Sequence, residues 1–157
     1  GYVIPGTGIM LNNMLGEEDI NPHGFHQWPE NRRIASMMSP TLVSGNDGRL
    51  IATGSGGSNR IRSAILQVLV NLLDYGMQIE QAVEQPRLHF ESDLLNVENA
   101  PYLADAVVEQ LFQAYTANRL WPHKNLFFGG AHSVMLTAGG KVYGQGDSRR
   151  GGVCIYV

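Results

Sequence analysis

Cysteine is nearly absent from this sequence, and long apolar runs and an excess of basic residues are missing altogether. The single cysteine, Cys154, excludes an internal disulfide and a cysteine metal cluster, and we expect it to pack in the core. No apolar run is long enough to span a bilayer. With 11 Lys and Arg against 14 Asp and Glu, the net charge is -3, which leaves no basic face for a nucleic-acid backbone. The sequence therefore predicts no membrane segment and no nucleic-acid partner.

What is present is typical of a globular chain. At 157 residues, of which 43% are hydrophobic, the sequence has enough apolar material to bury one core, and it predicts a single domain over residues 1–157. Gly1 opens a turn-rich segment without the basic start of a signal peptide. We therefore expect the chain to start inside a longer protein.

A glycine-rich stretch from Thr53 to Arg60 is the most informative local pattern. It lies between a short apolar run and the strongest helical period of the sequence, so it predicts a strand, a tight turn and a helix N-terminus. Backbone N–H groups and the helix dipole at such a turn can hold an anion or a developing oxyanion. The alternative interpretation is that the glycines only permit a tight turn.

The rest of the chain alternates between short apolar runs and helical periods. Expected strands cover residues 9–11, 33–43, 49–53, 87–90, 94–97, 133–137, 141–144 and 153–157, with a hairpin turn at 46–48. Expected helices cover residues 60–75, 79–85 and 102–118. Strands, then helices, then strands joined by hairpins predict an α+β fold or a layered α/β sandwich.

Two groups of polar residues raise the question of a metal or a second site. The acids from Glu17 to Asp19 precede His23 and His26, but their spacing matches neither a hard-cation loop nor a zinc site, so a solvated acidic turn is favoured and no metal is predicted. His89 alternates with apolar neighbours, which favours a hydrogen-bonded histidine in a sheet.

The polar loop at residues 147–152 contains Arg149 and Arg150. Arginines in such a loop bind a carboxylate or, more often, pin the loop or a partner surface.

Five short blocks resemble the small subunit of gamma-glutamyltransferase, also called gamma-glutamyltranspeptidase, in order and in approximate spacing. They are LNN at 11–13, SMMSPT at 36–41, TGSGGSNRI at 53–61, DYGM at 74–77 and QPR at 85–87. The resemblance implies a four-layer αββα fold of the N-terminal-nucleophile hydrolase type, made as a precursor that cleaves itself into a large and a small subunit. It also implies an enzyme without a cofactor.

In that family the new N-terminal threonine of the small subunit attacks a gamma-glutamyl carbonyl, with its own α-amine as the base. Here Gly1 and Tyr2 stand at the start and no threonine pair is present. The resemblance therefore predicts a small-subunit-like fragment that lacks the hairpin with the nucleophile, and this chain alone is expected to be inactive.

The family stabilises the tetrahedral oxyanion with two consecutive glycine N–H groups. The matching positions are Gly57 and Ser58, and because a backbone donor survives a change of side chain, the resemblance implies an oxyanion hole here.

The residues implied to bind the substrate head group depart further from the family pattern. Ser36 matches the first of two serines that hold the substrate α-carboxylate, whereas Met37 replaces the second, so one contact is expected to be lost. After Asn13, the family carries a glutamine and, three positions later, an aspartate for the α-ammonium group. Met14 and Glu17 stand there, and only Glu17 keeps a polar group.

Two alternatives of other kinds stay open. Met14 and Met37 favour an amidase of the same scaffold, similar to cephalosporin acylases, and the missing nucleophile suits a non-catalytic partner module. The expected partners are a large subunit from the same precursor or another copy of the chain, and a small gamma-glutamyl or acyl-amide substrate. The resemblance implies a periplasmic or extracellular location, with the cytoplasm as the alternative.

Overall fold

The computed structural model describes residues 1–156. The chain divides into two compact units, and the first of them ends at Met37. One unit covers residues 1–37 and the other covers residues 38–157. The single domain over residues 1–157 stays a prediction. No helix in the described part of the chain combines the length and the apolar character needed to cross a membrane.

The unit of residues 1–37 contains little regular structure. Val3 and Met10 form an isolated antiparallel bridge, so the strand expected at residues 9–11 is reduced to one pair. Two short 3-10 helices follow, η1 (Met14–Gly16) and η2 (Glu18–Ile20). The buried side chain of Asn21 donates hydrogen bonds to the carbonyl oxygens of Leu15 and Glu17, at 2.9 and 2.6 Å. A polar side chain therefore closes both turns.

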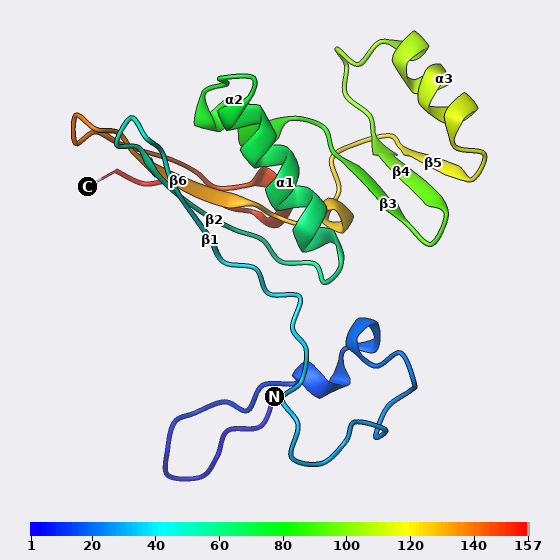
Figure 1. Cartoon of the computed structure of the whole chain (residues 1–157), viewed down its shortest axis with the longest axis vertical. Coiled ribbons are helices and arrows are strands. Elements are labelled where there is room, and N and C mark those ends of the chain that lie inside the picture. Colours follow the sequence, from blue (N-terminus) through cyan, green and yellow to red (C-terminus); the bar gives the residue numbers. More distant parts are fainter. Residues whose placement is uncertain (157) are drawn as a thin grey trace. The chain divides into compact units, whose positions relative to one another are not determined.

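The unit of residues 38–157 is built on a four-stranded antiparallel sheet in the order β1-β2-β6-β7 (Figure 1). Its strands are β1 (Thr41–Ser44), β2 (Leu50–Gly54), β6 (His132–Leu136) and β7 (Val142–Gln145). The predicted hairpin turn before β2 is confirmed, since Gly48 adopts a φ of 81° and its N–H bonds the Gly45 carbonyl at 3.0 Å. The strand expected from residue 33 begins only at Thr41, because Pro40 has no N–H to donate to a ladder.

One face of this sheet carries the core. A row of apolar side chains crosses all four strands, where Val43 pairs with Ile51, Ile51 with Met135 and Met135 with Tyr143. The helices α1 (Arg60–Leu73) and α2 (Ile79–Glu84) cover that row. Each aliphatic side chain buried in this layer contributes about 1.5–3 kcal/mol. The helices predicted over residues 60–75 and 79–85 are thus confirmed, and they form one layer on one sheet.

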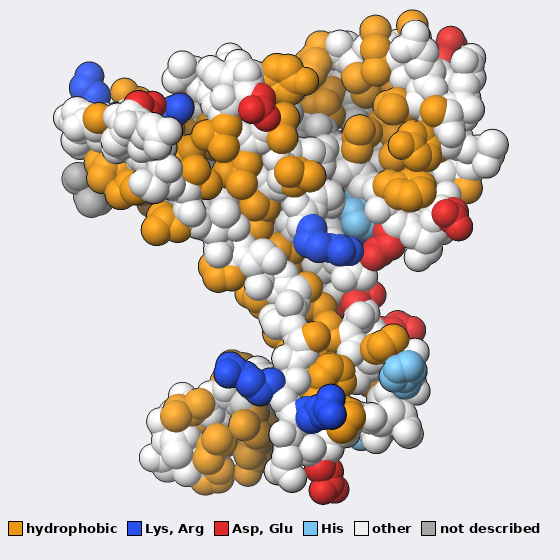
Figure 2. Space-filling model, in the orientation of Figure 1, with side chains coloured by type: hydrophobic (Ala, Val, Ile, Leu, Met, Phe, Trp, Pro, Cys, Tyr) orange, Lys and Arg blue, Asp and Glu red, His pale blue; other side chains and the backbone are white. Residues whose placement is uncertain are grey.

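The opposite face of the same sheet is apolar and exposed. Because side chains alternate along a strand, Leu42, Leu50, Val134, Leu136 and Val142 share this face. Leu42 is 72% exposed and Val142 is 54% exposed. Figure 2 shows one side of the molecule, where hydrophobic side chains are also numerous at the surface.

A second, three-stranded sheet in the order β3-β4-β5 completes the unit. β3 (Leu88–Glu91) and β4 (Leu94–Glu98) are the two strands expected here, and they pair antiparallel. The helix α3 (Asp105–Ala114) leads to β5 (Asn118–Trp121), which is parallel to β4. The helix predicted over residues 102–118 was too long, and β5 was missed. The residues of β5 become a strand by pairing with β4, and they show no alternation of apolar and polar side chains that would indicate a strand.

The end of the chain corrects two predictions. Residues 153–156 form no strand, and Val157 of the expected strand lies outside the described residues. Cys154 is exposed, so the prediction that it packs in the core is wrong. The segment is held instead by the Tyr156 hydroxyl, which accepts a bond from the Gly144 N–H at 3.1 Å. The α+β class as a whole is confirmed.

Candidate functional site

The glycine-rich stretch forms the predicted strand, turn and helix N-terminus. β2 ends at Gly54 and α1 begins at Arg60. Within the turn Gly57 has a φ of 121° and Ser58 a φ of 56°. The left-handed conformation costs a non-glycine residue about 1–2 kcal/mol, so the surrounding structure holds Ser58 in a conformation that it would not choose alone.

The peptide between Gly57 and Ser58 is oriented by the helix. The Arg60 N–H donates to the Gly57 carbonyl at 3.2 Å, which directs that carbonyl into α1. The C=O and N–H of a trans peptide point in opposite directions, so the Ser58 N–H points away from the helix. This donor and the positive end of the helix dipole face the same side. Such an arrangement suits the stabilisation of an anionic oxygen.

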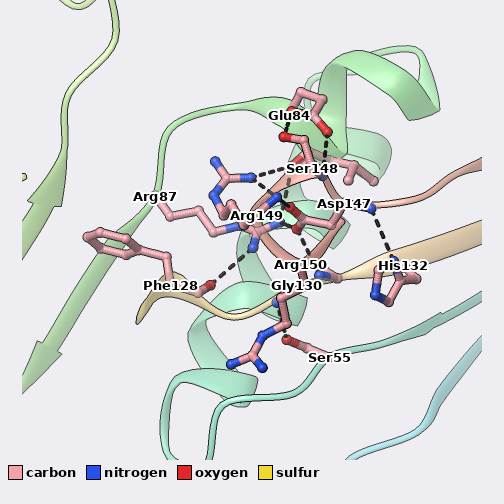
Figure 3. Close-up of polar contacts among 12 residues, drawn as sticks. Ser55, Glu84, Arg87, Phe128, Gly130, His132, Asp147, Ser148, Arg149 and Arg150 are labelled. Atoms are coloured by element: carbon pink, nitrogen blue, oxygen red, sulfur yellow. Dashed lines mark hydrogen bonds and ion pairs between the residues drawn. The ribbon is translucent and has the colours of Figure 1, made fainter. Parts of the chain in front are cut away.

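One hydrogen bond fixes the turn from outside, since the Gly130 N–H donates to the Ser55 hydroxyl at 3.1 Å (Figure 3). Arg150 lies beside the turn and donates from Nη2 to the Leu126 carbonyl at 3.3 Å. Arg150 Nη2 also lies 3.0 Å from the point that a Cβ on Gly57 would occupy. The conformation and the space at Gly57 therefore both favour glycine.

The roles of Ser55 and the segment around Gly130 were not predicted. The pair of glycines at 129 and 130 is the sequence feature that could have indicated this close approach. An added Cβ at Gly129 would lie 2.7 Å from the Ser55 hydroxyl, so the two segments approach as closely as glycine allows.

A buried ion network lies beside the turn. Asp147 bonds Arg87 Nη2 at 2.6 Å and Arg149 Nη1 at 3.2 Å, and Arg149 Nη2 bonds Glu98 at 2.5 Å. All of these side chains are at most 2% exposed. Burial alone would raise the pKa of the Asp147 carboxyl, but the charges of Arg87 and Arg149 and two backbone N–H donors hold that pKa below its usual value. The positive charges of two buried arginines thus balance the negative charges of two buried carboxylates.

The network joins parts of the chain that are distant in sequence. Arg87 precedes β3, Glu98 ends β4, and Arg149 lies in the short 3-10 helix η4 (Ser148–Arg150). Arg149 also donates to the carbonyls of Val83 and Gln85. The prediction that these arginines meet a carboxylate or pin a loop is confirmed for Arg149. By holding η4, the network places Arg150 against the glycine turn (Figure 3).

Glu84 attaches η4 at the edge of the network. Its carboxylate accepts bonds from the Ser148 N–H and hydroxyl and pairs with Lys124. Burial acts to raise the pKa of Glu84, but Lys124 and Ser148 outweigh it and lower the pKa from 4.5 to about 2.

His89 forms the hydrogen-bonded sheet histidine that the alternation predicted. It is 5% exposed, and its ring nitrogens bond the Ser63 hydroxyl at 2.7 Å and Glu91 at 3.2 Å. Nδ1 thus links β3 to α1, and Nε2 bonds a neighbour within β3.

The predicted substrate residues lie in the unit of residues 1–37. Asn13 and Glu17 flank η1 at its two ends, and both are exposed. Ser36 is exposed and Met37 half-buried at the end of that unit. The structure thus brings Asn13 close to Glu17 in one turn, and brings Gly57 close to Ser58 in the other unit.

The chain matches known proteins over its whole length. The family model described as Gamma-glutamyltranspeptidase matches residues 1–157. A glutathione hydrolase proenzyme of Escherichia coli is 30% identical over 161 residues, covering 95% of this chain and 27% of the relative. The acylase ACY 1 proenzyme of a Pseudomonas species is 35% identical over 109 residues, covering 69% of this chain and 19% of the relative. This chain spans between 16% and 28% of the length of the curated relatives that it matches.

A solved gamma-glutamyltranspeptidase of Helicobacter pylori superposes with a TM-score of 0.73 at 29% identity, covering 94% of this chain and 85% of that one. The expected class is thereby confirmed, and the chain has a fold of the N-terminal-nucleophile hydrolase type. It belongs to the gamma-glutamyltranspeptidase family.

Proposed function

We propose that the complete protein transfers or hydrolyses the acyl group of a gamma-glutamyl amide, as glutathione contains, and that this chain contributes the oxyanion hole. The observation that carries the proposal is the turn before α1, where Gly57 and Ser58 have positive φ and the Ser58 N–H points away from the helix. Membership of the gamma-glutamyltranspeptidase family supports it.

The reaction passes through an acyl-enzyme. The hydroxyl of a threonine on residues beyond these 157 attacks the gamma-glutamyl carbonyl carbon, while the α-amine of that threonine takes the proton. The carbonyl oxygen becomes an anion and accepts hydrogen bonds from the N–H groups of Gly57 and Ser58. The C–N bond then breaks, the leaving amine takes the proton, and water or an acceptor amine attacks the resulting ester.

Four residues of the unit 1–37 are assigned to the donor head group. Glu17, an exposed carboxylate, binds the α-ammonium, and Asn13 at the other end of η1 contributes an amide. Ser36 donates to the α-carboxylate, and Met37 offers only its thioether there. In this proposal, these residues recognise the charged groups of the donor.

A large subunit from the same precursor is the proposed partner. The apolar face formed by Leu50, Val134, Leu136 and Val142 is too hydrophobic to remain solvated at low cost. Two sheets that pack face to face interdigitate side chains of this kind. The second sheet of an αββα sandwich is the element of the right shape. Its apolar contacts would bury this face in the assembled protein.

An acylase acting on another acyl group is the second candidate. Met14 and Met37 cannot give the hydrogen bonds that a glutamyl head group uses, and this favours a less polar donor. The similarity to an acylase proenzyme supports the same candidate.

The deciding experiment uses the complete processed protein on a gamma-glutamyl anilide and on an aliphatic acyl anilide. We expect faster turnover of the gamma-glutamyl compound, and in Glu17→Ala a loss of the preference for donors with an α-ammonium. Glu18→Ala, which changes the neighbouring acid, serves as the control and keeps the preference.

Turnover of the aliphatic compound alone would replace the first function by the second. Turnover of neither would leave a non-catalytic partner module. A periplasmic or extracellular location and the absence of a cofactor complete the proposal, and cell fractionation tests the location.

A further inference from the structure

His132 stands at the end of the sheet where the glycine turn begins. It is the first residue of β6, and in the register of the sheet it lies opposite Gly54, the last residue of β2. Because Gly54 has no side chain, the exposed imidazole borders an open pocket of about 410 Å³ rather than a cross-strand neighbour. Pro40, Leu42 and Ala52 supply apolar walls to this pocket.

The structure fixes which nitrogen of His132 carries the proton. The backbone N–H of Asp147 points at Nδ1 over 3.1 Å (Figure 3). A nitrogen that accepts a hydrogen bond uses its lone pair, so Nδ1 is unprotonated and the neutral ring carries its proton on Nε2. No residue within the described part of the chain bonds Nε2. The ring therefore offers a hydrogen-bond donor to the pocket.

Two rigid neighbours hold this orientation. The carboxylate of Asp147 is bonded by Arg87, by the Ala131 N–H and by the Arg149 N–H, so the backbone that orients His132 is anchored in the buried network. On the other side, a Cβ at Gly152 would lie 2.4 Å from Nδ1. The ring is thus confined between the Asp147 backbone and a position where only glycine fits.

We propose that His132 is a specificity-determining residue that donates its Nε2–H to a carboxylate oxygen on the head group of the acyl donor. The inference rests on the proposed acyl-transfer function and adds a residue that recognises the substrate of that reaction. The apolar walls suit the methylene chain of the donor, and the pocket volume lies in the range of small-molecule sites.

The test compares two donors in the complete processed protein. A gamma-glutamyl anilide and a 4-aminobutanoyl anilide share the acyl chain and the ammonium group and differ in the α-carboxylate. In His132→Leu we expect kcat/KM for the first donor to fall by about tenfold, mainly through KM, and that for the second to change by less than about twofold. His132→Gln, whose amide N–H approximates the position of Nε2–H, restores most of the preference.

His123→Leu, a change at an exposed histidine of another pocket, is the matched control and leaves the ratio of the two donors unchanged. An equal loss on both donors in His132→Leu would overturn the specificity role and leave a structural one. Turnover of neither donor by the unaltered protein would retire the acyl-transfer function and this role with it.

The tautomer has a readout independent of activity. The ¹⁵N shifts of the neutral His132 ring should identify Nδ1 as unprotonated and Nε2 as protonated, and Gly152→Ala should perturb both by displacing the ring. A ring protonated on Nδ1 would overturn the inference even in a fully active enzyme.

Discussion

Residues 1–37 and the region beside the glycine turn hold their polar groups in opposite ways. In the first unit only Ile20 and Asn21 are buried, and the predicted head-group residues Glu17 and Ser36 are exposed. In the second unit, buried arginines and carboxylates support the turn from beneath. Buried charges thus hold the region beside the glycine turn, whereas the residues proposed to bind the donor head group lie at the surface of their unit. Changes in the two regions should therefore affect different measurements.

The largest effect is expected from Arg149→Met. The substitution leaves the buried carboxylate of Glu98 without an opposite charge and removes one of the two arginines that pair with Asp147. An uncompensated buried charge of this kind lowers the unfolding free energy by about 3–5 kcal/mol. Arg150→Met is the matched control at the adjacent, exposed position and should cost less than about 1 kcal/mol. Denaturant unfolding measures both. Similar small losses in the two variants would abolish the contrast between a buried frame and its surface.

A smaller effect, which disappears in acid, is expected from Glu84→Gln. Because the folded pKa of Glu84 is lowered from 4.5 to about 2, its ionised form stabilises the fold fully above pH 4.5, and that stability is lost as the pH falls towards 2. The difference in unfolding midpoint between wild type and variant should therefore shrink over this interval. A difference that stays constant from pH 6 downwards would show that Glu84 does not link η4 to Lys124 by charge.

The smallest effect on stability is expected from Glu17→Ala. Its side chain is exposed, and the hydrogen bond that closes its turn uses the Glu17 backbone carbonyl. The unfolding midpoint should shift by no more than corresponds to about 0.5 kcal/mol. Asn21→Ala, which removes the buried side chain that closes η1 and η2, should cost more. Thermal unfolding of the two variants side by side decides the order.

What the sequence predicted was local. The glycine turn and α1 follow from residues next to one another, because glycines mark the turn and an apolar period of 3.6 marks the helix. β5 could not be found, since Asn118 to Trp121 become a strand only by pairing with β4 across a helical crossover. The pairs of the buried ion network could not be predicted either, because partners such as Glu98 and Arg149 are 51 residues apart in the sequence. The orientation of His132 likewise depends on a backbone N–H fifteen residues away.

The order of strands in the main sheet has a consequence for how the protein folds. β2 and β6 are neighbours, and the hydroxyls of Thr53 and Ser133 bond at 2.8 Å across a separation of 80 residues. Central pairing therefore requires the whole intervening segment, including the second sheet, to close as a loop. Such non-local pairing slows folding, because the loop entropy is lost before the contacts form. The β1–β2 and β6–β7 hairpins should gain protection from hydrogen exchange early, and the central ladder that carries the glycine turn should gain it last.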